Sequence, residues 1–407
     1  MPALERPAAA RLVNGLGAGL QRIGISVSLD PDRLLETAAK RAGSSDFGPD
    51  GFLDGYRRLA ASLDGEARLN TIGQLAARTR LLTLLETRQR MLAWREQHSE
   101  VAAQRIERPI FVLGLPRTGT TVLYGLLAAN PAMRSPTSWE VARPFPPPTR
   151  QDRFDDHRIA DTEREFDQFR RVAPGIDRIH PLGAMLPQEC MAMHALSFES
   201  YEFVTTFPVP SYWAWLRERD LVPAYEIQRQ FLQHLQSGYS GEHWILKTPG
   251  HLLWLDTLLE VFPDALIVQT HRNPTTVMAS VSSLMFALRG AVSDHVDPHE
   301  VGRDQLDTWT WGLARTMAAR EKLPADRVID IHFTDTVNRP VETVTRIYEH
   351  FGLGLTAAVE QGVRDYLADN PRTKHGVHTY TLEEFGIDEA EADEAFAGYR
   401  ERFGVEQ

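Results

Sequence analysis

The chain has 407 residues, with 44 Lys and Arg against 55 Asp and Glu, and so carries a net charge of −11 at pH 7. This balance argues against a broadly basic surface of the kind that binds nucleic acid or anionic membranes. The single cysteine, Cys190, excludes an intramolecular disulfide framework and an all-cysteine zinc site, and indicates a reducing compartment. The sequence contains no run of about eighteen apolar residues that would predict a membrane span, and residues 1–24 lack the apolar core of a signal peptide. We therefore expect a cytoplasmic protein.

The pattern of apolar residues divides the chain into regions. Between Leu69 and about His98 they recur at helical spacing, which predicts a helical N-terminal extension over residues 1–105. Short apolar runs then follow at residues 110–113, 244–246, 265–268 and 328–331. Each run is followed by turn residues and then by a helix-like stretch. Strands that alternate with helices predict an α/β fold over residues 106–385, with a parallel sheet between two helical layers. Ligands of such folds bind beyond the carboxyl ends of the strands.

A long segment rich in aromatic residues, at about residues 140–240, separates the first two predicted strands. It includes Phe198, Tyr201, Trp213 and Trp215. We expect a helical insertion in which most aromatic side chains form a core and some line an apolar acceptor pocket. Residues 386–407 are expected to form a C-terminal helical tail.

The first strand runs into a glycine-rich turn, Gly114-Leu-Pro-Arg-Thr-Gly-Thr-Thr121, and then a helix. Such a turn presents backbone N–H groups and a helix N-terminus to an anion, as a P-loop does. Both glycines of the Walker pattern are present, but Thr120 stands where the pattern has its lysine. This argues against ATP or GTP hydrolysis. The cation lies inside the loop instead, at Arg117, which suits a shorter anion on a 5′-phosphate.

The run Leu115-Pro-Arg-Thr-Gly-Thr-Thr121 resembles the 5′-phosphosulfate loop of sulfotransferases that use 3′-phosphoadenosine 5′-phosphosulfate. The resemblance implies a P-loop-like fold, a sulfate donor of that chemistry as co-substrate, and no metal. It also implies that the 5′ end of the donor is held by five loop residues: Arg117, Thr118, Gly119, Thr120 and Thr121. Val122 departs from the family, since cytosolic members often carry a tryptophan there that stacks on adenine.

Two further segments resemble the family's 3′-phosphate site. Arg272 follows the third strand at a helix start, and Ser280 comes about two helical turns later, on the same face. Near the C-terminus, Arg372 and Lys374 lie in a segment that loosely resembles the one closing over this phosphate. A solvated basic loop explains that segment equally well.

The residues that would carry the chemistry are a cation and a base. The chain has only four lysines among 44 basic residues, and one of them, Lys247, directly follows the second strand. A compact ammonium can act as a point charge and proton donor, and the resemblance implies contact with the sulfate and the leaving oxygen. Glu140 is the preferred base, by resemblance to tyrosylprotein sulfotransferases at a spacing that differs by about two residues. His251 is the second candidate for the base. Glu189 and His194, both in the insertion, are further candidates for this role.

The sequence therefore predicts sulfuryl transfer to a hydroxyl or amine of a small, apolar or amphipathic acceptor. The expected partner is the small-molecule acceptor, with no nucleic acid and no membrane span. The sequence leaves open whether the protein forms a homo-oligomer. A P-loop kinase or nucleotide hydrolase is the main alternative, and it would require magnesium and a triphosphate. A nucleotide-binding protein without catalysis is a second alternative.

Overall fold

The computed structural model describes residues 7–22, 26–172, 181–370 and 380–405. Within these ranges one sheet is formed by β1 (Ile110–Gly114), β2 (Ile245–Lys247), β3 (Leu266–His271) and β4 (Val328–His332). The strands are all parallel, in the order β2-β1-β3-β4. Val112 of β1 is the register partner of both Lys247 and Val268. The prediction of a parallel sheet built from these four segments is confirmed.

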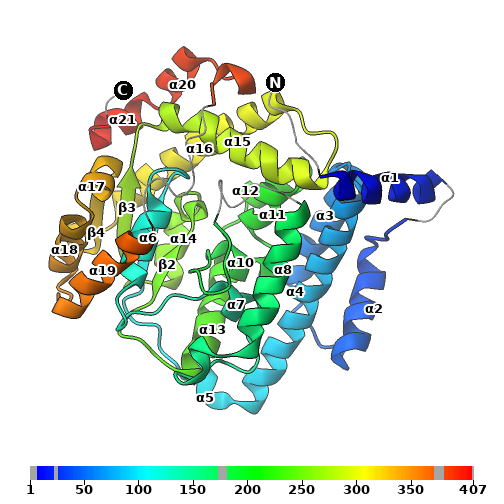
Figure 1. The fold of residues 1–407 in the computed structure, drawn as a ribbon, viewed down its shortest axis with the longest axis horizontal. Helices are drawn as coiled ribbons and strands as arrows, with labels where there is room; N and C mark the ends of the chain where they lie inside the picture. Colours follow the sequence, from blue (N-terminus) through cyan, green and yellow to red (C-terminus); the bar gives the residue numbers. More distant parts are fainter. Residues whose placement is uncertain (1–6, 23–25, 173–180, 371–379, 406–407) are drawn as a thin grey trace.

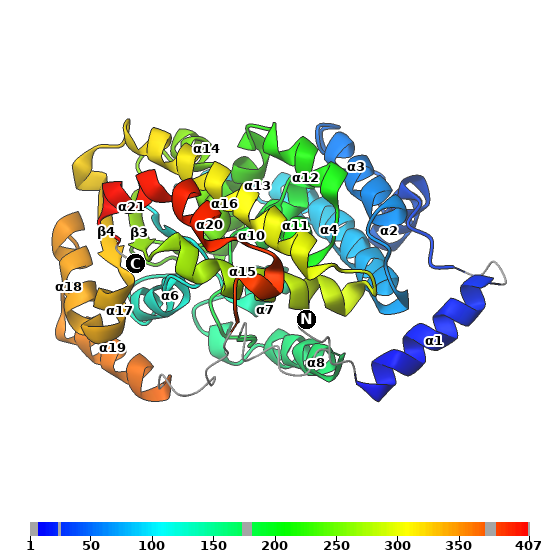
Figure 2. The ribbon, with the colours of Figure 1, turned by 90° about the horizontal axis from the view of Figure 1, so that it is seen from above.

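Successive side chains of β1 alternate between the two faces of the sheet. Ile110 and Val112 pack in one cluster with α6 (Thr120–Ala128), α18 (Pro340–Phe351) and α19 (Ala357–Asp369). Phe111 and Leu113 pack in a larger cluster that contains residues of α14 (Leu255–Val261), α15 (Pro274–Val292) and α16 (Pro298–Arg320). Figure 2 shows β3 and β4 between α6 and α19 on one side and α14 and α16 on the other. This is the expected three-layer arrangement.

The N-terminal extension is helical, as predicted. It consists of α1 (Ala8–Arg22), α2 (Pro31–Ala42), α3 (Phe52–Gly65), α4 (Thr71–Gln97) and α5 (Ser99–Ala102). Asn70 caps α4 by accepting a hydrogen bond from the N–H of Gly73 at 2.9 Å. Helices α2 to α4 lie at the opposite end of the molecule from β4 (Figure 1).

The insertion between β1 and β2 is also helical. It contains α7 (Ser138–Ala142), α8 (His157–Val172), α10 (Met191–His194), α11 (Tyr201–Thr206), α12 (Pro210–Arg217) and α13 (Val222–Gly238). Most of its aromatic side chains are buried, among them Phe198, Tyr201, Phe203, Phe207, Tyr212 and Trp213. They form the core that was predicted for this region.

The C-terminal part adds α17 (Phe333–Asn338), directly after β4, then α20 (Glu389–Ala395) and α21 (Ala397–Phe403). Helix α15 is long and apolar enough to cross a membrane by length and composition. However, 67% of its apolar window is buried within the fold, as in the core helices of many globular proteins. By itself this helix is weak support for a membrane span.

Candidate active site

The turn between β1 and α6 is held in a fixed shape by its backbone and one hydroxyl. Arg117 and Gly119 adopt left-handed backbone angles, with φ of 70° and 86°. The Thr118 hydroxyl donates to the carbonyl of Leu115 at 2.6 Å and lies 2.7 Å from the hydroxyl of Thr270 in β3. Thr118 is therefore buried and anchors the turn to the neighbouring strand. The side chain of Arg117 remains exposed at the carboxyl edge of the sheet.

Helix α6 begins directly at the end of this turn. Thr120, its first residue, is buried, whereas Thr121 and Val122 are exposed. The N–H groups of a first helical turn have no acceptor within the helix, and they form the positive end of its dipole. Such N–H groups next to the side chain of Arg117 can bind an anion, which is the role predicted for this turn.

Arg272 lies beside this turn, at the end of the adjacent strand β3. Its Nη1 donates to the carbonyl of Arg117 at 3.1 Å, and its guanidinium lies 4.4 Å from the ring centre of Phe333. Burial, and secondarily the charge of Arg117, lower the pKa of Arg272. Two predicted donor segments thus meet at one edge of the sheet, where their positive charges repel each other. An anion bound between them would relieve that repulsion.

Three other residues were predicted to contact the donor: Ser280, Arg372 and Lys374. Ser280 is partly exposed on α15, about two turns from the helix start. Arg372 and Lys374 lie outside the described residues. Phe333, beside Arg272, is not among the predicted site residues, because no local signal in the sequence links it to Arg272. The contact depends on the order of β3 and β4 in the sheet.

Lys247, the last residue of β2, forms a buried ion pair with Glu189. Its Nζ lies 2.5 Å from Glu189 Oε1, and the side chains are only 3% and 10% exposed. The Thr248 hydroxyl donates to the other carboxylate oxygen, Oε2, at 2.9 Å. The N–H of Cys190 donates to the carbonyl of Lys247 at 3.0 Å, which ties this part of the insertion to the strand end. An ammonium and a carboxylate therefore meet at the carboxyl end of the strand next to β1.

Glu140, the preferred base, is fully engaged in hydrogen bonds inside the fold. One oxygen accepts from the N–H and hydroxyl of Thr137, forming a capping box at the start of α7. The other oxygen accepts from Arg134 Nη2 at 3.1 Å and from the Tyr239 hydroxyl at 3.2 Å. Both Glu140 and Arg134 are nearly inaccessible to solvent. This arrangement favours a structural role for Glu140 over the predicted catalytic one.

The two candidate histidines are also buried. His251 lies in a 3₁₀ turn, Pro249–Leu252, with Nδ1 2.9 Å from the hydroxyl of Tyr225. The Nε2 of His194 lies 2.6 Å from the Oε1 of Gln228. Burial lowers the pKa of His194 to about 4, and burial lowers that of His251 well below its usual value. Both side chains are enclosed: the ring centre of His251 lies 5.0 Å from that of Phe111 in β1 and 5.9 Å from that of His194.

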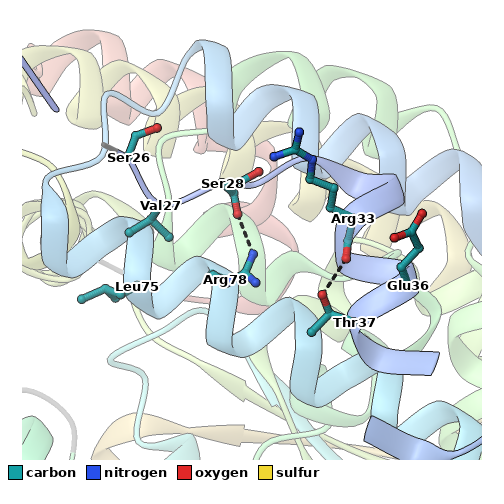
Figure 3. Close-up of a pocket in the computed structure, with 8 residues that line it drawn as sticks. All are labelled: Ser26, Val27, Ser28, Arg33, Glu36, Thr37, Leu75 and Arg78. Atoms are coloured by element: carbon teal, nitrogen blue, oxygen red, sulfur yellow. Dashed lines mark hydrogen bonds between the residues drawn. The ribbon is translucent and has the colours of Figure 1, made fainter. Parts of the chain in front are cut away.

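A pocket of about 600 Å³ lies elsewhere, on the N-terminal helices (Figure 3). It is lined by residues of α2, of α4 and of the segment preceding α2: Ser26, Val27, Ser28, Arg33, Glu36, Thr37, Leu75 and Arg78. None of them belongs to the predicted site, and α2 and α6 lie far apart in both views of the fold. Within the described ranges, no group of three or more His, Cys, Asp or Glu side chains is arranged to hold a metal ion.

Comparison with known proteins identifies relatives over most of the chain. A model described as "Sulfotransferase family" matches residues 109–357. The omega-hydroxy-beta-dihydromenaquinone-9 sulfotransferase Stf3 of Mycobacterium bovis is 27% identical over 314 residues, which cover 74% of this chain and 76% of Stf3. The same figures hold for Stf3 of Mycobacterium tuberculosis.

Two crystal structures of sulfotransferases superpose along nearly the whole chain. STF1 from Mycobacterium tuberculosis is 34% identical, with a TM-score of 0.81 over 90% of this chain and 98% of STF1. STF9 from Mycobacterium avium is 30% identical, with a TM-score of 0.85 over 92% of this chain and 97% of STF9. Because at least 90% of this chain is covered, the similarity extends into the helical N-terminal extension. The chain belongs to the sulfotransferase family.

Proposed function

We propose that this sulfotransferase takes its sulfuryl group from 3′-phosphoadenosine 5′-phosphosulfate. The observation that carries the proposal is the contact between Arg272 and the turn at Arg117. It brings two guanidinium groups and the N-terminus of α6 to one edge of the sheet. A donor with phosphates at its 5′ and 3′ positions offers matching negative charges. The missing Walker lysine, replaced by Thr120, argues against a triphosphate.

In the proposed reaction, Lys247 and Glu189 carry the chemistry. The acceptor oxygen attacks sulfur while the bond from sulfur to the phosphate oxygen breaks, and the electron pair remains on that oxygen. Lys247 stabilises the negative charge that develops there. Glu189, which accepts hydrogen bonds from Lys247 and Thr248, takes the proton of the acceptor hydroxyl. Glu189 replaces Glu140 as base in this proposal, because the oxygens of Glu140 already bind Thr137, Arg134 and Tyr239.

We further propose an apolar or amphipathic acceptor with a hydroxyl group. Stf3 is named for a hydroxylated menaquinone derivative, which is an acceptor of this class. The low content of basic residues relative to acidic ones argues against a polyanionic glycan. The single cysteine supports a reducing, cytoplasmic location.

Isothermal titration calorimetry with adenosine 3′,5′-bisphosphate tests the donor assignment. The wild-type protein should bind this ligand with micromolar affinity without magnesium, and Arg272→Ala should lose most of that affinity. Arg303→Ala, which removes an exposed arginine on α16, is the matched control and should bind normally. Tighter binding of ATP with magnesium than of the bisphosphate would overturn the proposal in favour of a kinase or hydrolase.

A further inference from the structure

The C-terminal helices α20 and α21 contact the β3–α15 junction on both sides of Arg272. On one side, Nδ1 of His271 lies 2.7 Å from the Tyr399 hydroxyl of α21. On the other, the Thr275 hydroxyl donates to Oδ1 of Asp393 in α20 at 2.7 Å. Figure 1 shows the two helices lying along the end of β3 and the start of α15. Arg272 is therefore held between two contacts to a segment about 120 residues further along the chain.

The contact at His271 belongs to a directed chain of hydrogen bonds. Nε2 of His271 lies 2.7 Å from Asp330 Oδ1, and Asp330 also accepts from both terminal nitrogens of Arg320, at 2.7 and 2.9 Å. An ionised carboxylate only accepts, so the ring proton resides on Nε2. Nδ1 then accepts a hydrogen bond from the Tyr399 hydroxyl. The ring also stacks on Phe403, with 4.2 Å between centres.

The contact at Thr275 fixes the first turn of α15. Asp393 accepts from the Thr275 hydroxyl and, through the same oxygen, from Arg400 at 2.8 Å. The backbone N–H of Thr275 donates to the capping side chain of Asn273 at 3.0 Å. Arg400 of α21 balances the charge of Asp393 in this ion pair.

Arg272 itself is held more weakly. Its side chain donates a hydrogen bond to the Arg117 carbonyl and stacks on Phe333, and it is only half-buried. The position of its backbone therefore depends on its neighbours in the chain. Fixing that backbone before a ligand arrives reduces the ordering cost of binding.

We propose that α20 and α21 are a positioning element for the donor site. In this inference, which rests on the proposed function, Tyr399 and Asp393 touch no ligand. They hold the backbone on both sides of Arg272 so that its guanidinium meets the 3′-phosphate. They thereby determine selectivity for adenine nucleotides that carry a 3′-phosphate over those that lack it.

Two variants test the two contacts separately. Tyr399→Phe removes the hydroxyl at His271, and Thr275→Val removes the hydroxyl bound by Asp393 while leaving the C-terminal helices unchanged. For each variant, calorimetry gives the affinities for adenosine 3′,5′-bisphosphate and for adenosine 5′-monophosphate. We expect the bisphosphate to bind about tenfold more weakly, as the loss of one supporting hydrogen bond suggests. The monophosphate should bind as before, so the selectivity ratio falls. The KM for the donor should rise while kcat stays unchanged.

The control is Tyr348→Phe, which removes a buried tyrosine hydroxyl that accepts a hydrogen bond from Asn130 on the α6 side of the sheet. Its selectivity ratio should equal that of the wild type. The inference is overturned if both variants keep the wild-type ratio, or if they weaken the two nucleotides equally, as a general loss of structure would. It also falls, together with the proposed donor, if the wild-type protein shows no preference for the bisphosphate. If the wild-type protein prefers the bisphosphate and both variants keep the same selectivity ratio, only the role of the C-terminal helices is refuted.

Discussion

At the scale of single residues, the ion pair of Lys247 and Glu189 is the feature with the greatest chemical consequence. Both side chains are buried. In this low-dielectric interior the two ions attract each other strongly, but either ion without its partner would be strongly destabilising. A sulfuryl donor that approached Lys247 would compete for its ammonium and weaken its hold on the carboxylate. Glu189 would then be a stronger hydrogen-bond acceptor at the moment when the acceptor hydroxyl must lose its proton.

The first prediction concerns this carboxylate. Glu189→Gln is nearly isosteric and can still accept a hydrogen bond from Lys247 or Thr248, but it cannot take a proton. We expect the rate of sulfate transfer to fall by about 10²- to 10⁴-fold, the usual contribution of a general base. Binding of adenosine 3′,5′-bisphosphate, measured by calorimetry, should persist. Transfer at the wild-type rate would exclude Glu189 as the base.

The second prediction assigns the opposite behaviour to Glu140→Gln. This change leaves the buried Arg134 without its carboxylate partner, and breaking a buried pair in this way costs about 3–5 kcal/mol of stability. Urea denaturation should show a lower midpoint than that of the wild type. Under native conditions, kcat per folded molecule should stay within a few-fold of the wild-type value. A stable but inactive variant would return the catalytic role to Glu140.

At the scale of elements, the turn into α6 depends on a glycine. Gly119 has a φ of 86°, and a Cβ there would lie 3.1 Å from Cδ2 of Phe333. Gly119→Ala should cost about 1–2 kcal/mol in backbone strain and weaken bisphosphate binding, because the turn presents the N–H groups of the proposed donor site. Gly65→Ala is the control, since a Cβ at the end of α3 meets no atom within 4 Å. Thermal unfolding and calorimetry on both variants check this, and unchanged binding in Gly119→Ala would contradict it.

At the scale of the whole molecule, buried histidines predict a loss of stability in acid. Burial is the main cause that lowers the pKa of both His194 and His234 to about 4. Below a pH of about 6.5 the unfolded chain takes up protons that the folded protein excludes, so the free energy of unfolding falls until about pH 4. At pH 5 each of the two histidines should lower the free energy of unfolding by about 2 kcal/mol.

Urea denaturation at pH 7 and pH 5 measures this loss. His194→Gln keeps a polar side chain beside Gln228. Between pH 7 and pH 5 its free energy of unfolding should fall by about 2 kcal/mol less than that of the wild type. An equal loss in the two proteins would show that His194 does not take part. Because the effect belongs to folding, it should appear without any ligand.

Much of this molecule could be predicted from its sequence because the signals were local. The four strands are short apolar runs, the turn carries its own glycines, and Asn273-Pro274 starts a helix wherever it lies. These features depend on neighbours within a few residues. The family and the parallel sheet followed from them, and the comparisons agree with both.

Which charged side chains meet depends on the tertiary fold and is not visible in the sequence. Glu189 lies 58 residues from Lys247 along the chain, and the contact forms because the helical insertion returns to the end of β2. Glu140 and Glu189 look alike as sequence, but one lies beside a buried arginine within a capping box and the other beside the lysine. The negative net charge is a property of composition alone. The place where a few positive charges gather for an anion depends on the order of strands in the sheet, which brings Arg117 and Arg272 together.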